Sequence, residues 1–274
     1  MKQRIPVEYG TKLYLAIAFS VTWLGWIGAY FISILTDNTL KMDGTVFDLF
    51  INFKPNSAFF IQLIFALAVY GPLAGFLAVK GQKMLFKRDS ATPNYWHYVL
   101  LVPTVSVLPV LLLSLISGQF TDSGESLIAI LLSVAIYFLS NLITSGTEEF
   151  GWRGYLYPVL KAKNKTFWDT SWKGGIIWAL WHYPLLIIMY LPQGFAILLP
   201  SLIGFTASIV AMSYISNFIY EKSKSIWTVV VLHALNNTGS FLIILLFPGS
   251  YFSFITSIMS WVIVAYIEKM HKIS

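Results

Sequence analysis

Residues 127–153 read LIAILLSVAIYFLSNLITSGTEEFGWR, an uncharged apolar run that leads into two adjacent glutamates. The run from Leu127 to Ile143 is nearly as long as the roughly 20 helical residues that cross a bilayer. Glu148 and Glu149 follow it with no turn signal before Gly151, so we expect the helix to continue through them. Ionisable residues at membrane depth are costly and are therefore read first as functional. The stretch predicts a membrane helix that carries a functional site at its end.

The composition places the whole chain in a membrane. Of its 274 residues, 57% are hydrophobic and 11% are charged, whereas soluble domains have about 25% charged residues. The polar intervals between apolar runs are too short to form a separate soluble core. We therefore expect one integral-membrane domain over residues 1–274, an all-α bundle of transmembrane helices, with its catalytic core between about residues 127 and 247.

Two further features of the composition narrow the function. Cysteine is absent, which excludes disulfides, thiolate metal sites and cysteine nucleophiles from this sequence. Any chemistry has to use carboxylates, imidazoles or hydroxyls. The net charge of +6 comes without the basic and aromatic stripe of a nucleic-acid-binding surface. We expect the lipid bilayer as a partner and no nucleic acid.

Eight apolar runs are long enough, or nearly so, to cross the bilayer as helices. The third run is interrupted by Pro103 and Pro109, and the sixth by Pro200 and Gly204. Such kinks are tolerated where neighbouring helices satisfy the freed backbone groups. The eight predicted cores are Leu13–Leu35, Phe59–Val79, Tyr98–Ile116, Leu127–Ile143, Gly174–Tyr190, Phe195–Ile215, Ile226–Phe247 and Tyr251–Tyr266.

The lysines and arginines predict how these helices are oriented, because cytoplasmic loops carry the excess of positive charge. With both chain ends in the cytoplasm, all 18 of these residues except Lys41 and Lys54 lie inside. Thr36–Ser57 is then the largest outer loop, and Lys80–His97 is a basic inner loop. We interpret Met1–Lys12 and the apolar run after it as an uncleaved signal anchor. The predicted location is the cell membrane, as a multi-pass protein.

The glutamate pair divides into two different groups. Helical spacing puts Glu149 and Arg153 at i and i+4, where a carboxylate and a guanidinium can pair on one helix face. Glu148 points about 100° away from that pair and is free for another task. Taken alone, two glutamates could also mark a helix end where charges meet water and headgroups.

Two histidines lie inside other apolar runs. His182 follows Trp178 by one turn, about 12 Å from a helix start at Gly174. His233 shares a face with Asn237 and is about 10 Å from a helix start near Ile226. A lone intramembrane histidine could simply hydrogen-bond a neighbouring helix.

The orientation of the helices brings these groups together. Both histidines lie on helices that enter from the cytoplasm, and Glu148 is near the cytoplasmic end of a helix that runs the other way. We expect the three helices to converge in one cavity that faces the cytoplasm. A free carboxylate, two imidazoles and a carboxamide are suited to activating water and stabilising an oxyanion.

Three motifs occur in order along the chain: Glu148-Glu149-x-x-x-Arg153, Trp178-x-x-x-His182 and His233-x-x-x-Asn237. This set resembles the CAAX-protease and bacteriocin-processing (CPBP, Abi-type) family of intramembrane endopeptidases. The resemblance covers roughly Leu127 to Phe247, and the eight-helix topology is also typical of the family. One position departs from it, because the commoner family form has Phe where this chain has Trp178; we expect the change to alter packing beside His182 without removing chemistry.

The resemblance implies a role for each motif residue. Glu148 and His182 would hold and activate a water molecule, with Glu148 as general base. His233 and Asn237 would stabilise the oxyanion, and Glu149, Arg153 and the aromatic residue at 178 would organise the site. The implied activity is a peptidase that cuts near the cytoplasmic membrane face. Its substrate would be a peptide or protein, which carries a lipid in part of the family.

The sequence allows a zinc cofactor without requiring one. It has no His-Glu-x-x-His motif, and the family has been described both as zinc-dependent and as glutamate-dependent without metal. If zinc were bound, its ligands would be Glu148, His182 and His233.

Two other functions remain open from the sequence. One is a catalytically inactive scaffold or regulator that binds a signalling or immunity partner through the same cavity. The other is a small transporter with a proton relay, since buried carboxylates and histidines occur in pumps. The second is disfavoured because the polar groups cluster near one face and do not continue outward.

Overall fold

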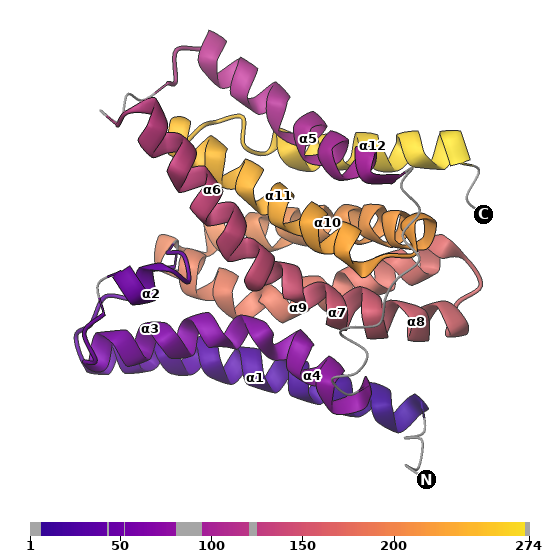
Figure 1. Ribbon diagram of the computed structural model, residues 1–274, viewed down its shortest axis with the longest axis horizontal. Coiled ribbons are helices and arrows are strands. Elements are labelled where there is room, and N and C mark those ends of the chain that lie inside the picture. Colours follow the sequence, from indigo (N-terminus) through magenta and orange to yellow (C-terminus); the bar gives the residue numbers. More distant parts are fainter. Residues whose placement is uncertain (1–6, 43, 52, 81–94, 121–124, 272–274) are drawn as a thin grey trace.

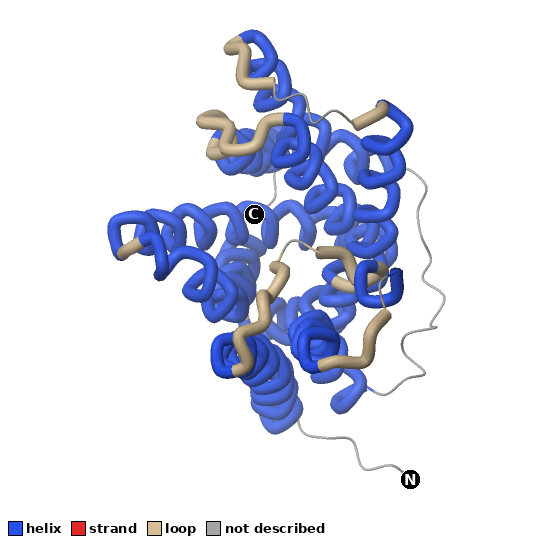
Figure 2. Tube along the Cα trace, turned by 90° about the vertical axis from the view of Figure 1, so that its left-hand side faces the viewer, coloured by secondary structure: helices blue, strands red, loops and turns tan. Residues whose placement is uncertain are grey.

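A computed structural model describes residues 7–42, 44–51, 53–80, 95–120 and 125–271 of the protein, and all regular structure in these residues is helical (Figures 1 and 2). The all-α architecture predicted from the sequence is therefore confirmed. The predicted inner loop 80–97, the cations Lys2, Arg4 and Lys272, and Asp43 lie wholly or mostly outside the described residues. The longer helices are α1 (Val7–Leu35), α3 (Ser57–Leu67), α4 (Gly71–Lys80), α5 (Trp96–Ile116), α6 (Leu127–Ile143), α9 (Phe167–Tyr190), α10 (Phe195–Ser223), α11 (Ile226–Leu246) and α12 (Ile255–His271).

Shorter elements join or interrupt these helices. They are α2 (Asp48–Ile51), η1 (Ala68–Tyr70), η4 (Ser145–Thr147), α7 (Glu148–Gly151), the π-helical η5 (Trp152–Leu156), α8 (Tyr157–Lys163) and η6 (Leu191–Gln193). π-helical turns are rare and are frequent at functional sites. One lies directly after the predicted site residues Glu148 and Glu149.

Seven of the described helical segments are long and apolar enough to cross a membrane, one fewer than predicted. The missing one is the last. Residues 251–254 form turns, so α12 begins at Ile255 and has 17 residues. That is about 25 Å of helix, whereas the hydrocarbon core is about 30 Å thick. Helix α5 continues through Pro103 and Pro109, and α10 continues through Pro200 and Gly204, so neither run is divided into separate helices.

The helices form layers (Figure 1). Helix α1 packs against α3 and α4, and α9 lies between α1 and α10, while α11 packs against α5 and α6. The approach of α1 to α4 depends on Gly71, where a Cβ atom would lie 2.3 Å from the carbonyl oxygen of Ala18. Close backbone contact through small residues is the usual way in which membrane helices associate.

The predicted fourth span is not one straight helix. The helix α6 ends at Ile143, and Thr144 has φ −108° and ψ −97°, outside the helical region. Gly146 then lies against α11, where a Cβ would be 3.0 Å from Val230 Cγ1. The break brings the start of α7, and with it Glu148, against the helix that carries His233.

Several of the described basic residues lie at one end of the bundle. Lys80, Lys163, Lys222 and Lys269 lie at or near the ends of α4, α8, α10 and α12, all on the right in Figure 1. The loop that joins α1 to α3, with Lys41 and Lys54, lies at the opposite end, which faces the viewer in Figure 2. This separation is what the positive-inside prediction requires, although the side of the membrane on which each end lies stays a prediction.

Candidate functional site

Glu148 is 2% exposed and is held by two tryptophans. The indole nitrogens of Trp152 and Trp178 donate to the same carboxylate oxygen, Oε2, at 3.1 and 3.0 Å. No described residue hydrogen-bonds Oε1, so that oxygen is available to another molecule. Sequence reasoning missed Trp152. The signal was present, because Trp152 follows Glu148 by four residues, the same spacing as Glu149 and Arg153.

Glu149 is fully buried and has charged or ionisable partners. Its Oε2 lies 3.0 Å from Nη1 of Arg153, so the predicted i,i+4 contact is present. Its Oε1 lies 2.9 Å from Nδ1 of His233 on α11, a contact that the sequence did not predict. A carboxylate on Nδ1 fixes the orientation and tautomer of an imidazole. Glu149 therefore positions the ring of His233 and leaves its second nitrogen, Nε2, for another partner.

His182 is oriented by its own helix. Its Nδ1 lies 2.9 Å from the carbonyl oxygen of Trp178, which can only accept, so Nδ1 carries the proton and Nε2 is the acceptor of the neutral ring. The ring packs against Trp181 and Phe205 at centroid distances of 4.6 and 5.0 Å.

The depth predicted for His182 was wrong. The helix α9 begins at Phe167 and not at Gly174, because Thr166 caps it by accepting a hydrogen bond from the backbone N–H of Asp169. His182 is therefore about 22 Å from that helix end. His233 is about 10 Å from the start of α11 at Ile226, as predicted.

Asn237 is positioned by a residue that the sequence patterns did not single out. Its Nδ2 donates to Oδ1 of Asn141 at 3.0 Å, and Asn141 in turn donates to the carbonyl of Tyr137 at 2.9 Å. A carboxamide has two N–H donors, so one of those of Asn237 remains for another acceptor. A buried asparagine in the otherwise apolar run of α6 was the signal for this contact.

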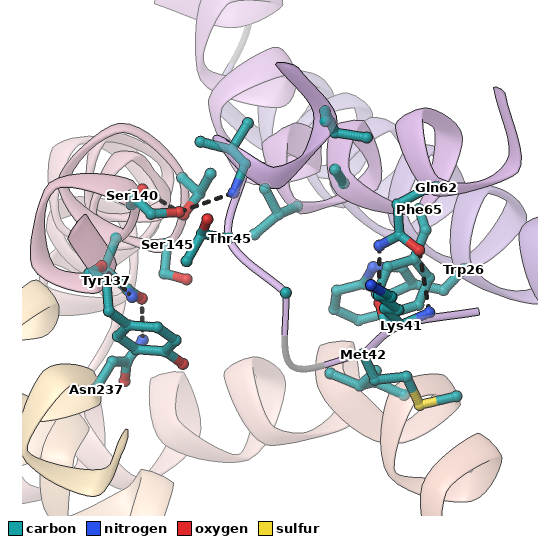
Figure 3. Close-up of a pocket in the computed structure, with 18 of the residues that line it drawn as sticks. Trp26, Lys41, Met42, Thr45, Gln62, Phe65, Tyr137, Ser140, Ser145 and Asn237 are labelled. Atoms are coloured by element: carbon teal, nitrogen blue, oxygen red, sulfur yellow. Dashed lines mark hydrogen bonds between the residues drawn. The ribbon is translucent and has the colours of Figure 1, made fainter. Parts of the chain in front are cut away.

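The predicted catalytic residues lie around one small cavity of about 110 Å³. Glu148, His182, His233 and Asn237 all line it, with Phe205, Ile209 and Met212 of α10 on another side. A larger cavity of about 270 Å³ adjoins it and shares Ser145, Glu148, His182 and Asn237. Figure 3 shows this larger cavity, with Asn237, Tyr137 and Ser140 on one side and Lys41, Gln62 and Trp26 on the other.

The larger cavity reaches the loop between α1 and α3. Its walls include residues 41, 42, 44–46 and 49 of the loop between α1 and α3. That loop is at the end of the bundle opposite the basic side chains, where positive charge predicts the outer side. If both chain ends are cytoplasmic, this wall of the cavity lies toward the outer side of the membrane. The side from which the cavity is entered stays a prediction.

The conditional zinc ligands do not form a metal-binding group. Within residues 7–42, 44–51, 53–80, 95–120 and 125–271, no three His, Asp or Glu side chains are placed to hold a metal ion. Nδ1 of His233 is engaged by Glu149, and Oε2 of Glu148 by the two indoles. Each side chain still has a second polar atom without a described partner, so it is the spacing of the three side chains that does not fit a zinc site.

Fold and site together define a multi-pass helical membrane protein with a buried cavity that holds a carboxylate, two imidazoles and a carboxamide. The family model "Type II CAAX prenyl endopeptidase Rce1-like" matches residues 128–239, which contain all seven predicted site residues. The chain is also 26% identical over 250 residues to CAAX prenyl protease 2 of Methanococcus maripaludis, covering 84% of this chain and 83% of that protein. The resemblance to the CAAX-protease family is thus confirmed.

Proposed function

We propose that this protein is an intramembrane endopeptidase of the CAAX-protease type, which hydrolyses a peptide bond with a water molecule activated by Glu148. The observation that carries the proposal is the convergence of Glu148, His182, His233 and Asn237 on one cavity of about 110 Å³. The similarity to a CAAX prenyl endopeptidase family and to a CAAX prenyl protease supports the peptidase class.

In the proposed reaction, the two sides of the cavity have different tasks. On one side, the free Oε1 of Glu148 and the Nε2 acceptor of His182 hold a water molecule. Glu148 takes one proton from it as the oxygen attacks the peptide carbonyl carbon. A neutral His182 with its proton on Nδ1 can only accept at Nε2, so it holds the water through one of the water's hydrogens.

On the other side, the carbonyl oxygen becomes an oxyanion next to His233 and Asn237. The remaining N–H of the Asn237 amide and an N–H at Nε2 of His233 stabilise it. His233 donates at both nitrogens only as imidazolium, and the Glu149 carboxylate at Nδ1 balances that charge. The intermediate collapses as the C–N bond breaks and Glu148 returns the proton to the leaving amine. The products are a new carboxyl group and a new amino group, with one water consumed.

The substrate that we propose is a membrane-associated peptide or protein. The names of the family model and of the archaeal relative include the word prenyl, which supports a lipid on the substrate. With both chain ends in the cytoplasm, the loop between α1 and α3 is on the outer side, and the peptide reaches the site past that loop. This replaces the entry from the cytoplasmic face that the sequence suggested.

Hydrolysis can be tested directly by isotope labelling. Purified protein in detergent is incubated with a pool of short randomised peptides in H₂¹⁸O, and the products are analysed by mass spectrometry. We expect one ¹⁸O atom in each newly formed C-terminus, and no product from the Glu148→Gln, His182→Ala or His233→Ala variants. Full activity of any of these three variants would refute the assignment of the site.

The side of entry has its own test, because the sequence contains no cysteine. A single cysteine is introduced as Lys54→Cys or as Lys163→Cys, and intact cells are treated with a membrane-impermeant maleimide. We expect labelling at position 54 and labelling at position 163 only after lysis. The reverse pattern would return the entry to the cytoplasmic face.

A further inference from the structure

Two cavities meet at the proposed site, and four residues line both of them. These shared residues are Ser145, Glu148, His182 and Asn237. A residue that lines both cavities borders the opening between them, so these side chains surround the place where a peptide in the larger cavity meets the reacting groups. Glu148, His182 and Asn237 already have tasks in the proposed reaction. Ser145 is the fourth, and it has none.

The hydroxyl of Ser145 differs from those of its neighbours in having no protein partner. Thr144 donates its hydroxyl to the carbonyl of Ser140 at 2.8 Å, and Thr147 donates to the carbonyl of Thr144 at 2.6 Å. Hydroxyls on helices often bond in this way to a carbonyl three or four residues earlier. Ser145 is half-buried, yet no described residue hydrogen-bonds its Oγ. This hydroxyl is therefore available to a molecule in the cavities.

The break at the end of α6 gives Ser145 its position, because the 3₁₀ turn η4 begins there. The next residue, Gly146, packs on Val230 of α11, where a Cβ would lie 3.0 Å from Cγ1. Val230 is three residues before His233 and seven before Asn237, so all three lie on one face of α11. The turn that carries Ser145 is thus held against the helix face that supplies the oxyanion side of the site.

This position suits a donor to the oxyanion. Figure 3 shows Ser145 on the same side of the larger cavity as Asn237. His182, which holds the water in the proposed reaction, comes from α9 instead. A serine hydroxyl has one donor hydrogen, which rotates to reach an acceptor. Such a donor is most effective where negative charge develops in a cavity from which water is excluded.

We propose that Ser145 is a third donor to the oxyanion, together with His233 and Asn237. As the water oxygen attacks the peptide carbonyl carbon, electrons of the C=O bond move to its oxygen. The hydroxyl of Ser145 hydrogen-bonds this oxyanion and keeps its own proton. The inference rests on the proposed peptidase function and adds a catalytic residue that the three sequence motifs do not contain. The hydroxyl contributes little to binding of the uncleaved peptide, because the charge that it stabilises has not yet formed.

Thr147 offers a matched control two residues away. Its hydroxyl is bonded to a carbonyl, and the residue lines neither cavity. We compare Ser145→Ala with Thr147→Val, both of which remove a hydroxyl, and with Ser145→Thr, which keeps one. The substrate is a peptide that the unaltered protein cleaves, chosen from the randomised pool.

We expect Ser145→Ala to lower kcat about ten- to a hundredfold, the range for a hydrogen bond to a charged group, while KM changes by less than about twofold. The thermal transition in detergent should stay the same. Ser145→Thr should lose less activity than Ser145→Ala, and Thr147→Val should keep the kcat of the unaltered protein.

Two inhibitors with the sequence of that peptide separate a role in the reaction from a role in the fold. A peptide phosphinate has an anionic oxygen on a tetrahedral centre, as the intermediate does, whereas a reduced-amide peptide has no oxygen there. Ser145→Ala should weaken phosphinate binding by about the same factor as kcat/KM and leave reduced-amide binding unchanged. Dissociation constants do not depend on the folded fraction, so the comparison holds even if the folded yield falls.

An unchanged kcat in Ser145→Ala would overturn the role of Ser145. A change confined to KM would overturn it too, as would equal weakening of both inhibitors. Losses in Ser145→Thr or Thr147→Val as large as that in Ser145→Ala would have the same consequence. No cleavage of any peptide by the unaltered protein would instead refute the peptidase function.

Discussion

Glu148 and Glu149 are adjacent in sequence and almost equally buried, yet the structure surrounds them differently. Glu149 lies between a guanidinium and an imidazole, each within 3.0 Å. Glu148 has only two neutral indole N–H groups, both on one oxygen, and its second oxygen is free of described partners. One carboxylate is therefore compensated by charge, and the other is oriented by neutral donors.

This difference explains how two identical side chains can have separate tasks. A buried carboxylate that is paired with a cation is held in place by a large energetic cost of separating the pair. It is suited to positioning a neighbour, here His233. A carboxylate with one free oxygen beside a cavity can bind and deprotonate water. The predictions below test each side of the comparison, from the largest expected effect to the smallest.

The largest effect should come from breaking the charged side. Arg153 is 1% exposed, and Arg153→Ala leaves Glu149 as a buried charge without its cation. We expect a loss of about 3–5 kcal/mol in the free energy of unfolding, seen as low folded yield and an early thermal transition in detergent. Lys161→Ala is the control, because its ion pair with Glu221 is on the surface and should contribute about 0–1 kcal/mol.

A double variant decides whether charge is the cause. Glu149→Gln/Arg153→Met removes both charges and should be less destabilised than Arg153→Ala alone, because no unpaired charge stays buried. If the double variant is the less stable of the two, packing of the arginine over the Trp178 ring, at 4.5 Å, is the dominant contribution instead.

A smaller effect should come from the neutral side. Trp178→Phe keeps an aromatic ring, and phenylalanine is the commoner form in the family that the motifs resemble, so the fold should tolerate it. It removes one N–H donor from Oε2 of Glu148. We expect kcat to fall about tenfold or more, within the range for a hydrogen bond to a charged group, with KM and thermal stability nearly unchanged. A kcat equal to that of the unaltered protein would show that Trp152 alone orients Glu148.

Some contacts among the site residues could be predicted from the sequence, and others could not. The separation of Glu149 and Arg153 from Glu148 follows from helical spacing, which is local. The contact of Glu149 with His233 joins residues 84 positions apart on α7 and α11, and no periodicity encodes it. The contact of Trp178 with Glu148 is equally non-local, so the sequence could assign position 178 to packing but not to hydrogen bonding.

The helix boundaries show the same limit. The eight apolar runs located every long helix, but not the turns at 251–254 that shorten α12 or the start of α9 at Phe167. Both errors arose because hydrophobicity marks where a helix can contact lipid, whereas helix ends are set by polar caps and turns. The second error mattered more, because it made the distance of His182 from the start of α9 about 10 Å too short.

The smallest effect should come from the asparagine pair that supports the oxyanion side. Asn141→Ala leaves Asn237 in place but removes its acceptor, a neutral hydrogen bond of 3.0 Å between half-buried and buried amides. Such a bond contributes about 1 kcal/mol, so we expect kcat to fall about fivefold while KM changes little. Asn141→Asp keeps an acceptor at the same position and serves as the conservative variant, although it adds a charge. If Asn237→Ala slows the reaction strongly and Asn141→Ala does not slow it at all, Asn237 is positioned by α11 alone. A loss in Asn141→Ala that Asn141→Asp partly restores would instead show that α6 orients the oxyanion donor through this one contact.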